Sequence, residues 1–301
     1  MTGCERPGVA AGGRGARVLK GEELKGAGLA VAATACFSTG AVLVRFAQAL
    51  SLFEVTSFRL LLGATFVGLA ARTRGIPLAL DKPLRWRVLA VGLVAALHFL
   101  TFIASIYYTS IAHALTLTYT APAMLALASR IFLGERLRPR QTLGVLLTVM
   151  GIALLAGFEP TLTPRMLGGD LLALGAAASF AAYSLLGRHL RAALPLLRYV
   201  FWVYLTAGLT TLPLAAATLT APYRVGPLFA VALQALLPVA FGHTLYNAAI
   251  RRLSPTLASL IASQEVTGGI LLGWLLLGEA ATPTTFAGVA VTLAGILLVL
   301  W

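Results

Sequence analysis

The chain has 301 residues, of which 59% are hydrophobic and only 11% are charged, and its mean hydropathy is +0.89. Soluble domains carry roughly a quarter charged residues, so this composition excludes an ordinary soluble protein. The net charge of +13 is compatible with nucleic-acid binding, but the positions of the basic residues favour membrane loops instead.

Residues 1–26 precede the first apolar run and are rich in Gly and Arg. They lack an apolar segment followed by a small-residue cleavage site, so we expect a disordered cytoplasmic leader and a first span that is retained. The two cysteines, Cys4 and Cys36, lie in the leader and in the first span, and we do not expect them to pair.

The apolar residues that follow form runs of about 18 to 23 residues, the length that a helix needs to cross about 30 Å of hydrocarbon. Backbone in lipid must satisfy its own hydrogen bonds, so the runs should be helices. The sequence therefore predicts an all-α integral membrane protein with ten transmembrane helices. We place them near 27–45, 53–71, 86–108, 111–133, 140–157, 168–188, 196–217, 226–248, 255–277 and 283–301. Kinks are expected at the internal prolines Pro122, Pro213 and Pro238.

Orientation follows from the basic residues, which concentrate in cytoplasmic loops of membrane proteins. With the N-terminus in the cytoplasm, all but four of the 23 Lys and Arg residues fall on that side. The four exceptions are Arg45, Arg59, Arg165 and Arg224. Ten spans then place both termini in the cytoplasm. The Ala, Gly, Leu and Arg bias fits a bacterium of high genomic GC content, so the expected location is the bacterial inner membrane.

The sequence also repeats itself at a shift of 144 residues. Leu133-Gly134-Glu135 recurs as Leu277-Gly278-Glu279. The matches continue with Pro139 and Pro283, Gly144 and Gly288, Thr148 and Thr292, and Gly151 and Gly295. At a shift of 143 residues, Phe37 matches Phe180 and Arg45 matches Arg188. Apolar composition alone does not easily produce such a series without a gap.

Five spans per repeat is an odd number, so the second copy must enter the membrane from the opposite side. The loops agree, because residues 134–140 are basic whereas residues 278–284 contain no arginine. We therefore expect a first five-helix repeat over residues 27–160 and an inverted second repeat over residues 165–301. Inverted repeats of this kind allow a bundle to rock between two states around a central site.

These residues carry a family resemblance. The twin Leu-Gly-Glu segments, each followed by a Gly-x6-Gly helix, resemble the EamA repeats of the drug/metabolite transporter superfamily over the whole chain after the leader. The resemblance implies ten spans in a five-plus-five inverted arrangement and a solute carrier, often an exporter. Within the superfamily, the chain looks similar to the YddG-type aromatic amino-acid exporters. Export rather than import is implied by this resemblance alone.

Ionisable residues far from span ends are costly in lipid and tend to face a cavity. Glu265 is the first candidate, either as a counter-charge for a substrate ammonium or as a protonatable coupling group. The alternative is a structural hydrogen bond or a pair with a basic residue such as Arg59. His98 could titrate or donate to a substrate carboxylate, or it could only bridge helices. Gln264 and Glu265 occupy the place of Thr120 and Ala121 in the first repeat, so the two halves differ there.

Aromatic residues provide a second set of candidates, because an aromatic-lined cavity suits a large apolar or aromatic solute. The candidates are Phe37, Phe180, Tyr183, Tyr119, Trp202 and Tyr204. Ordinary packing is the competing interpretation. An interfacial belt is favoured for Tyr107, Tyr108, Tyr223 and Trp301. Toward the cytoplasmic end of span eight, a gate is expected from His243, Tyr246 and Asn247.

Other features favour structural roles. Glu135 and Glu279 lie at span ends and are expected to make helix-end or loop interactions. Glycines spaced for close helix packing recur as Gly144 with Gly151, Gly288 with Gly295, and Gly269 with Gly273. The stripes on spans five and ten could serve packing within the bundle or a dimer contact.

The combined prediction is a secondary transporter that exports small, amino-acid-like or aromatic metabolites by alternating access, driven by proton exchange or by the solute gradient. No phosphate-binding Gly-x4-Gly-Lys-Ser/Thr motif occurs, and we expect no cofactor, metal or catalytic residue. The expected partners are a small-molecule substrate and the lipid bilayer, not nucleic acid, with a monomer or homodimer left open. Alternatives are a carrier of drugs, nucleosides or sugar derivatives, and a passive channel or membrane scaffold.

Overall fold

The computed structural model describes residues 21–121, 123–124, 138–157, 163–187, 190, 193–253, 258 and 261–300. All regular secondary structure in these residues is helical, as expected. The first half contains α1 (Glu22–Phe46), α2 (Leu52–Thr73), α3 (Lys82–Tyr108), α4 (Ile111–Thr118) and α6 (Pro139–Gly157). The second contains α7 (Pro164–Leu186), α9 (Leu196–Ala217), α10 (Val225–Gln234), η1 (Ala235–Gly242), α11 (His243–Ala249), α13 (Glu265–Leu277) and α14 (Pro283–Leu300).

In this part of the chain, six helices are long and apolar enough to cross a membrane. They are α1, α2, α3, α7, α9 and the continuous segment Val225–Ala249 formed by α10, η1 and α11. Shorter apolar helices correspond to α6, α13 and α14. The predicted span 111–133 extends beyond the described residues.

Local sequence signals set the helix ends. Ser51 and Glu54 form a capping box at the start of α2, in which each side chain accepts a hydrogen bond from the other residue's backbone N–H. Thr163 caps α7, and Pro164 occupies its first turn, where a missing backbone donor costs little. Gly278 ends α13 with φ +69°, a left-handed conformation that favours glycine.

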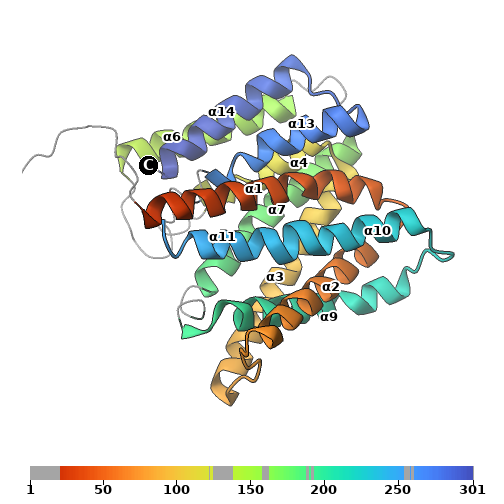
Figure 1. Ribbon diagram of the computed structural model, residues 1–301. Coiled ribbons are helices and arrows are strands. Elements are labelled where there is room, and N and C mark those ends of the chain that lie inside the picture. The colour runs from red at the N-terminus through yellow and green to blue at the C-terminus, as the bar shows by residue number, and fades with distance from the viewer. Residues whose placement is uncertain are drawn as a thin grey trace, which may run out of the picture.

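Corresponding helices of the two repeats pack against each other (Figure 1). α2 lies against α9 and α6 against α14, while α3 packs on α7 as α1 packs on the α10–η1–α11 segment. Along the α6–α14 contact, residue 144 meets residue 299 and residue 151 meets residue 292, so these corresponding helices are antiparallel. This arrangement is the one expected of two inverted repeats. We call the end where α1 finishes and α2 begins the distal end.

The α6–α14 contact depends on the glycines that the repeat predicted. A Cβ atom on Gly144 would lie 2.7 Å from the Gly295 carbonyl oxygen, and one on Gly151 would lie 2.5 Å from the Thr292 nitrogen. The predicted stripes therefore serve packing within the bundle. On α13, Gly269 and Gly273 face Leu115 and Ile111 of α4.

The helix between Val225 and Ala249 is interrupted by the π-helical segment η1, which contains Pro238. A proline removes a backbone donor, and π-helical turns often occur near functional sites. The predicted irregularity at Pro238 is therefore present. Pro213 lies inside α9, and Pro122 lies outside the described residues.

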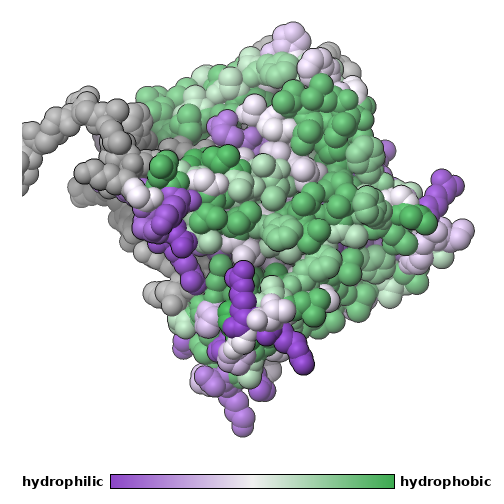
Figure 2. Space-filling model, in the orientation of Figure 1, coloured by the Kyte–Doolittle hydropathy of each residue, from purple (hydrophilic) through white to green (hydrophobic). Residues whose placement is uncertain are grey.

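The outer surface of the bundle is apolar. Figure 2 shows hydrophobic residues over most of one face, with hydrophilic residues near the start of α1, near the α2–α3 connection and where α1 ends. Large exposed apolar side chains include Leu146, Leu171, Phe229 and Leu275. Such a surface suits lipid rather than water.

We expect Gly151→Ala to destabilise the protein by about 1–3 kcal/mol, because the added methyl group overpacks a contact made by backbone atoms. The measurement is thermal unfolding in detergent. Gly168→Ala is the matched control, since no atom lies within 4 Å of a Cβ at that exposed helical position. Equal stability of the two variants would show that α6 and α14 are not in backbone contact.

Candidate functional site

Arg59 is buried in the middle of the bundle, on α2, with 3% of its surface exposed. Its Nη1 donates to Gln234 Oε1 at 3.0 Å. Within the described part of the chain, its Nε and Nη2 have no hydrogen-bond partner. An arginine inside a membrane bundle is costly, and unpaired donors add to that cost. From the sequence, Arg59 was assigned to the outer side and considered as a possible structural partner of Glu265, but it was not predicted as a site residue.

Gln234 holds Arg59 between three helices. It ends α10 immediately before the π-helical segment, and its Nε2 donates to the Gly40 carbonyl of α1. Gly63, one helical turn after Arg59, allows α2 to approach η1, because a Cβ there would lie 2.5 Å from Val239 Cγ1. The guanidinium carbon lies 5.2 Å from the centre of the Phe99 ring, within the range of a cation–π interaction.

Further aromatic side chains pack around Phe99, the ring that lies beside this arginine. The His243 ring centre lies 4.9 Å from that of Phe37, 5.9 Å from that of Phe99 and 6.2 Å from that of Tyr204. His243 was predicted to line a gate with Tyr246, but the structure places it among these rings. Tyr246 follows at 6.3 Å from Phe37. We call Arg59 and the rings of Phe37, Phe99, Tyr204, His243 and Tyr246 the central cluster.

The aromatic set continues toward α7. His98 packs 5.1 Å from Phe180, and Phe180 lies 6.0 Å from Tyr183. The buried His98 Nδ1 also lies 2.9 Å from the Ala176 carbonyl oxygen, so this histidine bridges α3 and α7. His98 therefore bridges two helices, which was one of the two roles considered for it from the sequence.

Glu265 begins α13 and is also buried. Its Oε2 accepts a hydrogen bond of 2.5 Å from the Tyr119 hydroxyl. The Glu265 carboxyl group is bound by Tyr119 and the Arg59 guanidinium by Gln234. The structure describes no direct pair between Glu265 and Arg59.

Three other predicted residues have no described hydrogen bond or ring contact with the central cluster, namely Thr120, Trp202 and Gln264, and Asn247 reaches only the backbone of His243. Thr120 and Asn247 donate to carbonyl groups of their own helices, Leu117 and His243 respectively. Trp202 donates to the Leu78 carbonyl in the α2–α3 connection. Gln264 is exposed, unlike its neighbour Glu265, because adjacent helical positions point in different directions.

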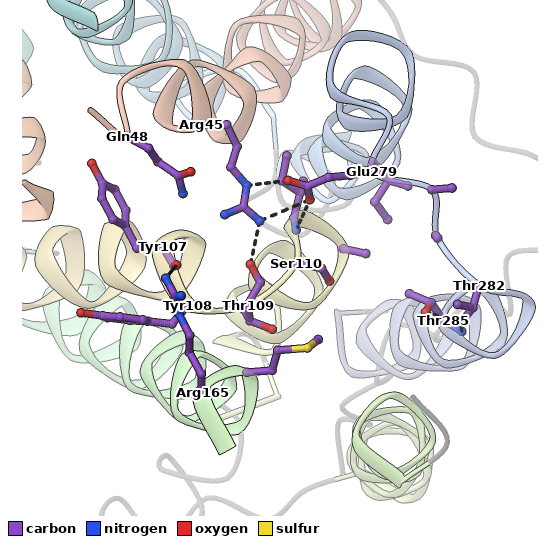
Figure 3. Close-up of a pocket in the computed structure, with 16 residues that line it drawn as sticks. Arg45, Gln48, Tyr107, Tyr108, Thr109, Ser110, Arg165, Glu279, Thr282 and Thr285 are labelled. Carbon is purple, nitrogen blue, oxygen red and sulfur yellow. Dashed lines mark hydrogen bonds and ion pairs between the residues drawn. The ribbon is translucent and has the colours of Figure 1, made fainter. Parts of the chain in front are cut away.

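A cavity of about 690 Å³ opens at the distal end (Figure 3). An ion pair between Arg45 and Glu279, with 2.6 Å between Nε and Oε1, lies on its wall. Arg45 also donates to the carbonyl groups of Ile106 and Thr109, and Glu279 accepts from the Ile111 N–H. The pair therefore connects α1, the α3–α4 turn and the α13–α14 loop. Glu279 makes the helix-end interaction that its repetition predicted, whereas Glu135 lies outside the described residues.

A second polar group at this end involves Glu54. The buried carboxylate accepts hydrogen bonds from the Ser51 N–H, from the Thr220 hydroxyl at 2.8 Å and from the Tyr223 hydroxyl at 2.9 Å. The hydrogen bond to Glu54 raises the pKa of Tyr223, since it holds the phenol proton. These contacts join the start of α2 to the α9–α10 connection.

Comparison with known proteins now decides the family. The model of the EamA-like transporter family matches residues 24–157 and again residues 167–301. The chain belongs to the EamA-like transporter family. The family resemblance inferred from the sequence is thus confirmed, and members of this family are transporters rather than enzymes.

Two curated relatives are the pseudopaline exporters CntI of Pseudomonas aeruginosa strains UCBPP-PA14 and PAO1. Each is 28% identical over 268 residues, which cover 86% of this transporter and 90% of the relative. A solved crystal structure shares the fold with a TM-score of 0.68 at 20% identity, covering 91% of this transporter and 96% of the other chain.

For the central cluster of this EamA-like protein, we expect Gln234→Leu to cost about 1.5–3 kcal/mol, the value of a hydrogen bond to a charged group. The change leaves the buried guanidinium without its described side-chain partner. Thermal unfolding in detergent measures the effect. Gln48→Leu, at an exposed position of the distal cavity, should change stability by no more than about 0.5 kcal/mol. Unchanged stability in Gln234→Leu would mean that Arg59 is satisfied in another way.

Proposed function

We propose that this protein is a secondary transporter that exports small, amino-acid-like metabolites with an aromatic or other apolar body. It works by alternating access in the bacterial inner membrane, with ten transmembrane helices and both termini in the cytoplasm. Membership of the EamA-like family supports transport, and the exporter name of the relatives from Pseudomonas aeruginosa supports outward movement. The excess of basic residues in alternate loops supports the orientation.

The observation that carries the substrate class is the buried Arg59 with two unpartnered donor atoms. A guanidinium presents its N–H groups as a planar fork that matches a carboxylate. A carboxylate-bearing solute would supply the missing acceptors and the missing negative charge. The solute's binding would thereby remove the cost of an unsatisfied arginine in a membrane bundle.

The surroundings of Arg59 fit the rest of such a solute. Glu265, which is buried and hydrogen-bonded to Tyr119, supplies a carboxyl group for an ammonium group. The rings of Phe37, Phe99 and Tyr204 supply an apolar and aromatic wall. Together they complement a zwitterion with an apolar body. The three groups come from α1, α2, α3, α9 and α13, and thus from both repeats.

A site shared by two inverted repeats is suited to alternating access, because rocking one repeat against the other exposes the site to each side in turn. Other solutes on the same fold, such as drugs, nucleosides or sugar derivatives, would not need both Arg59 and Glu265. A channel or scaffold would not show exchange of labelled for unlabelled solute.

The test is transport into liposomes that contain the purified protein, using a panel of labelled amino acids. We expect saturable uptake and counterflow of aromatic amino acids. In Arg59→Met, the half-saturating concentration should rise about tenfold or more, because truncating one partner of a buried charge pair typically costs about 2–5 kcal/mol. Glu265→Gln should weaken transport of the same solutes.

The matched control changes the solute instead of the protein. Amino-acid amides lack the carboxylate, so wild type should discriminate against them and Arg59→Met should not. Arg59→Lys keeps the charge without the planar fork and should fall between the two. Folding of each variant is checked by thermal unfolding. A folded wild type that transports no amino acid would reject this substrate class and direct the search to drugs and nucleosides.

A further inference from the structure

A second buried titratable group lies at the distal end, apart from the central cluster. His113 in α4 and Asp170 in α7 are 0% and 4% exposed. His113 Nδ1 lies 3.0 Å from Asp170 Oδ2 and 3.2 Å from Oδ1, so its N–H donates to the carboxylate. The Thr109 hydroxyl donates to Oδ1 at 2.6 Å. Neither member of this pair was predicted from the sequence as a site residue.

A close approach of α7 to the α3–α4 turn brings the pair together. A Cβ atom on Gly169 would lie 2.7 Å from the Thr109 nitrogen and 2.8 Å from the Tyr108 carbonyl carbon. Only glycine fits this contact. The next residue, Asp170, is thereby placed against Thr109 and His113. Because α4 belongs to the first repeat and α7 to the second, the pair joins the two halves of the transporter.

The same contact recurs at the opposite end of the bundle without the polar groups. Gly26 of α1 corresponds to Gly169, and Leu253 corresponds to Thr109; a Cβ on Gly26 would lie 2.8 Å from Leu253 Cγ. Ala27 stands in sequence where Asp170 stands, and Leu257 where His113 stands. At that end the glycine meets Leu253 Cγ and Arg252 Cβ, and no His–Asp pair stands at the corresponding sequence positions. The close helix approach thus recurs in the two repeats, whereas the buried His–Asp pair does not.

The pair is also connected to the distal ion pair. Thr109 donates its hydroxyl proton to Asp170, and its carbonyl oxygen accepts a 2.8 Å hydrogen bond from Arg45 Nη2. Arg45 in turn pairs with Glu279. Thr109 lies on the wall of the distal cavity, as Figure 3 shows, so the pair is one residue away from that cavity.

We propose that the His113–Asp170 pair is the proton-binding site that couples export to the proton gradient, an inference that rests on the proposed function. One proton enters from the distal cavity, binds to the pair while the solute leaves on that side, and is released on the other side when the bundle reorients. No covalent bond other than that to the proton is made or broken.

The coupling has a physical basis in the hydrogen bonds described. Bonds to a carboxylate are roughly twice as strong as bonds between neutral groups, so protonation of Asp170 weakens the Thr109 contact. Thr109 is then held less firmly, and so is the Arg45 contact on its carbonyl group. The charged and titratable groups described nearest the pair are Arg45 on α1, Tyr107 and Tyr108 on α3, Arg165 on α7 and Glu279 after α13; Glu54 and Tyr223 lie at the same end with partners of their own.

The experiment compares two kinds of transport in the same liposomes. Counterflow at equal pH reports solute exchange, and accumulation driven by a pH gradient reports coupling. In Asp170→Asn and His113→Asn, we expect counterflow to remain within about twofold of wild type and gradient-driven accumulation to fall about tenfold or more, within the range of coupling between linked sites. Asn at position 113 keeps an N–H donor near the place of Nδ1 but does not titrate.

Glu54→Gln is the matched control, because Glu54 is a buried carboxylate at the same end with its own partners. It should keep both activities. Gradient-driven accumulation that survives in both Asn variants would overturn the coupling site and leave the proposed function intact. A parallel loss of counterflow and accumulation, with lowered thermal stability, would show a merely structural pair. Absence of counterflow in wild type would overturn the proposed function and this inference with it.

Discussion

The buried guanidinium of Arg59 is the main physical constraint on the residues packed around it, because a charged group with unsatisfied donors is costly away from water. Gln234 reaches across to it from α10, Gly63 allows α2 to lie close to the π-helical segment beside it, and the Phe99 ring packs against it. A bundle built only for stability would replace such an arginine with an apolar side chain. Its retention is explained if the carboxylate of the proposed solute completes the site.

The helix packing follows the sequence repeat, whereas the ionisable residues do not. Packing follows the sequence repeat closely, so that α6 meets α14 and α2 meets α9. The ionisable residues break the symmetry: Glu265 has Ala121 as its counterpart, and Asp170 has Ala27. The residues that break the symmetry, Glu265 and Asp170, are those to which the proposed solute binding and proton coupling are assigned.

The sequence predicted the helices and the family because apolar runs, prolines and the Gly-Glu repeat are periodic or local signals. It predicted side-chain direction less well. Gln264 and Glu265 are adjacent, yet one is exposed and the other is buried, and hydropathy alone does not fix the rotation of a helix. Trp202 and Tyr204 are two positions apart and point to different neighbours for the same reason.

Arg59 and the His113–Asp170 pair were missed for different causes. Arg59 was assigned to the outer side of the membrane. Its place seven residues after the start of α2, an apolar helix of 22 residues, could have indicated a buried position. His113 and Asp170 are 57 residues apart, and only the fold brings them together. The Gly168-Gly169-Asp170 sequence hinted at a close approach but not at its partner.

The glycine contact between α6 and α14 limits how the halves can move. Packed helices slide past one another when side chains exchange rotamers, but Gly144, Gly151 and Gly295 meet mainly backbone atoms and have no side chains to rearrange. This pair of helices therefore resists shear. If the transporter works by the proposed alternating access, the two repeats would pivot about this contact, and the displacement would grow with distance from α6 and α14 toward α2 and α9.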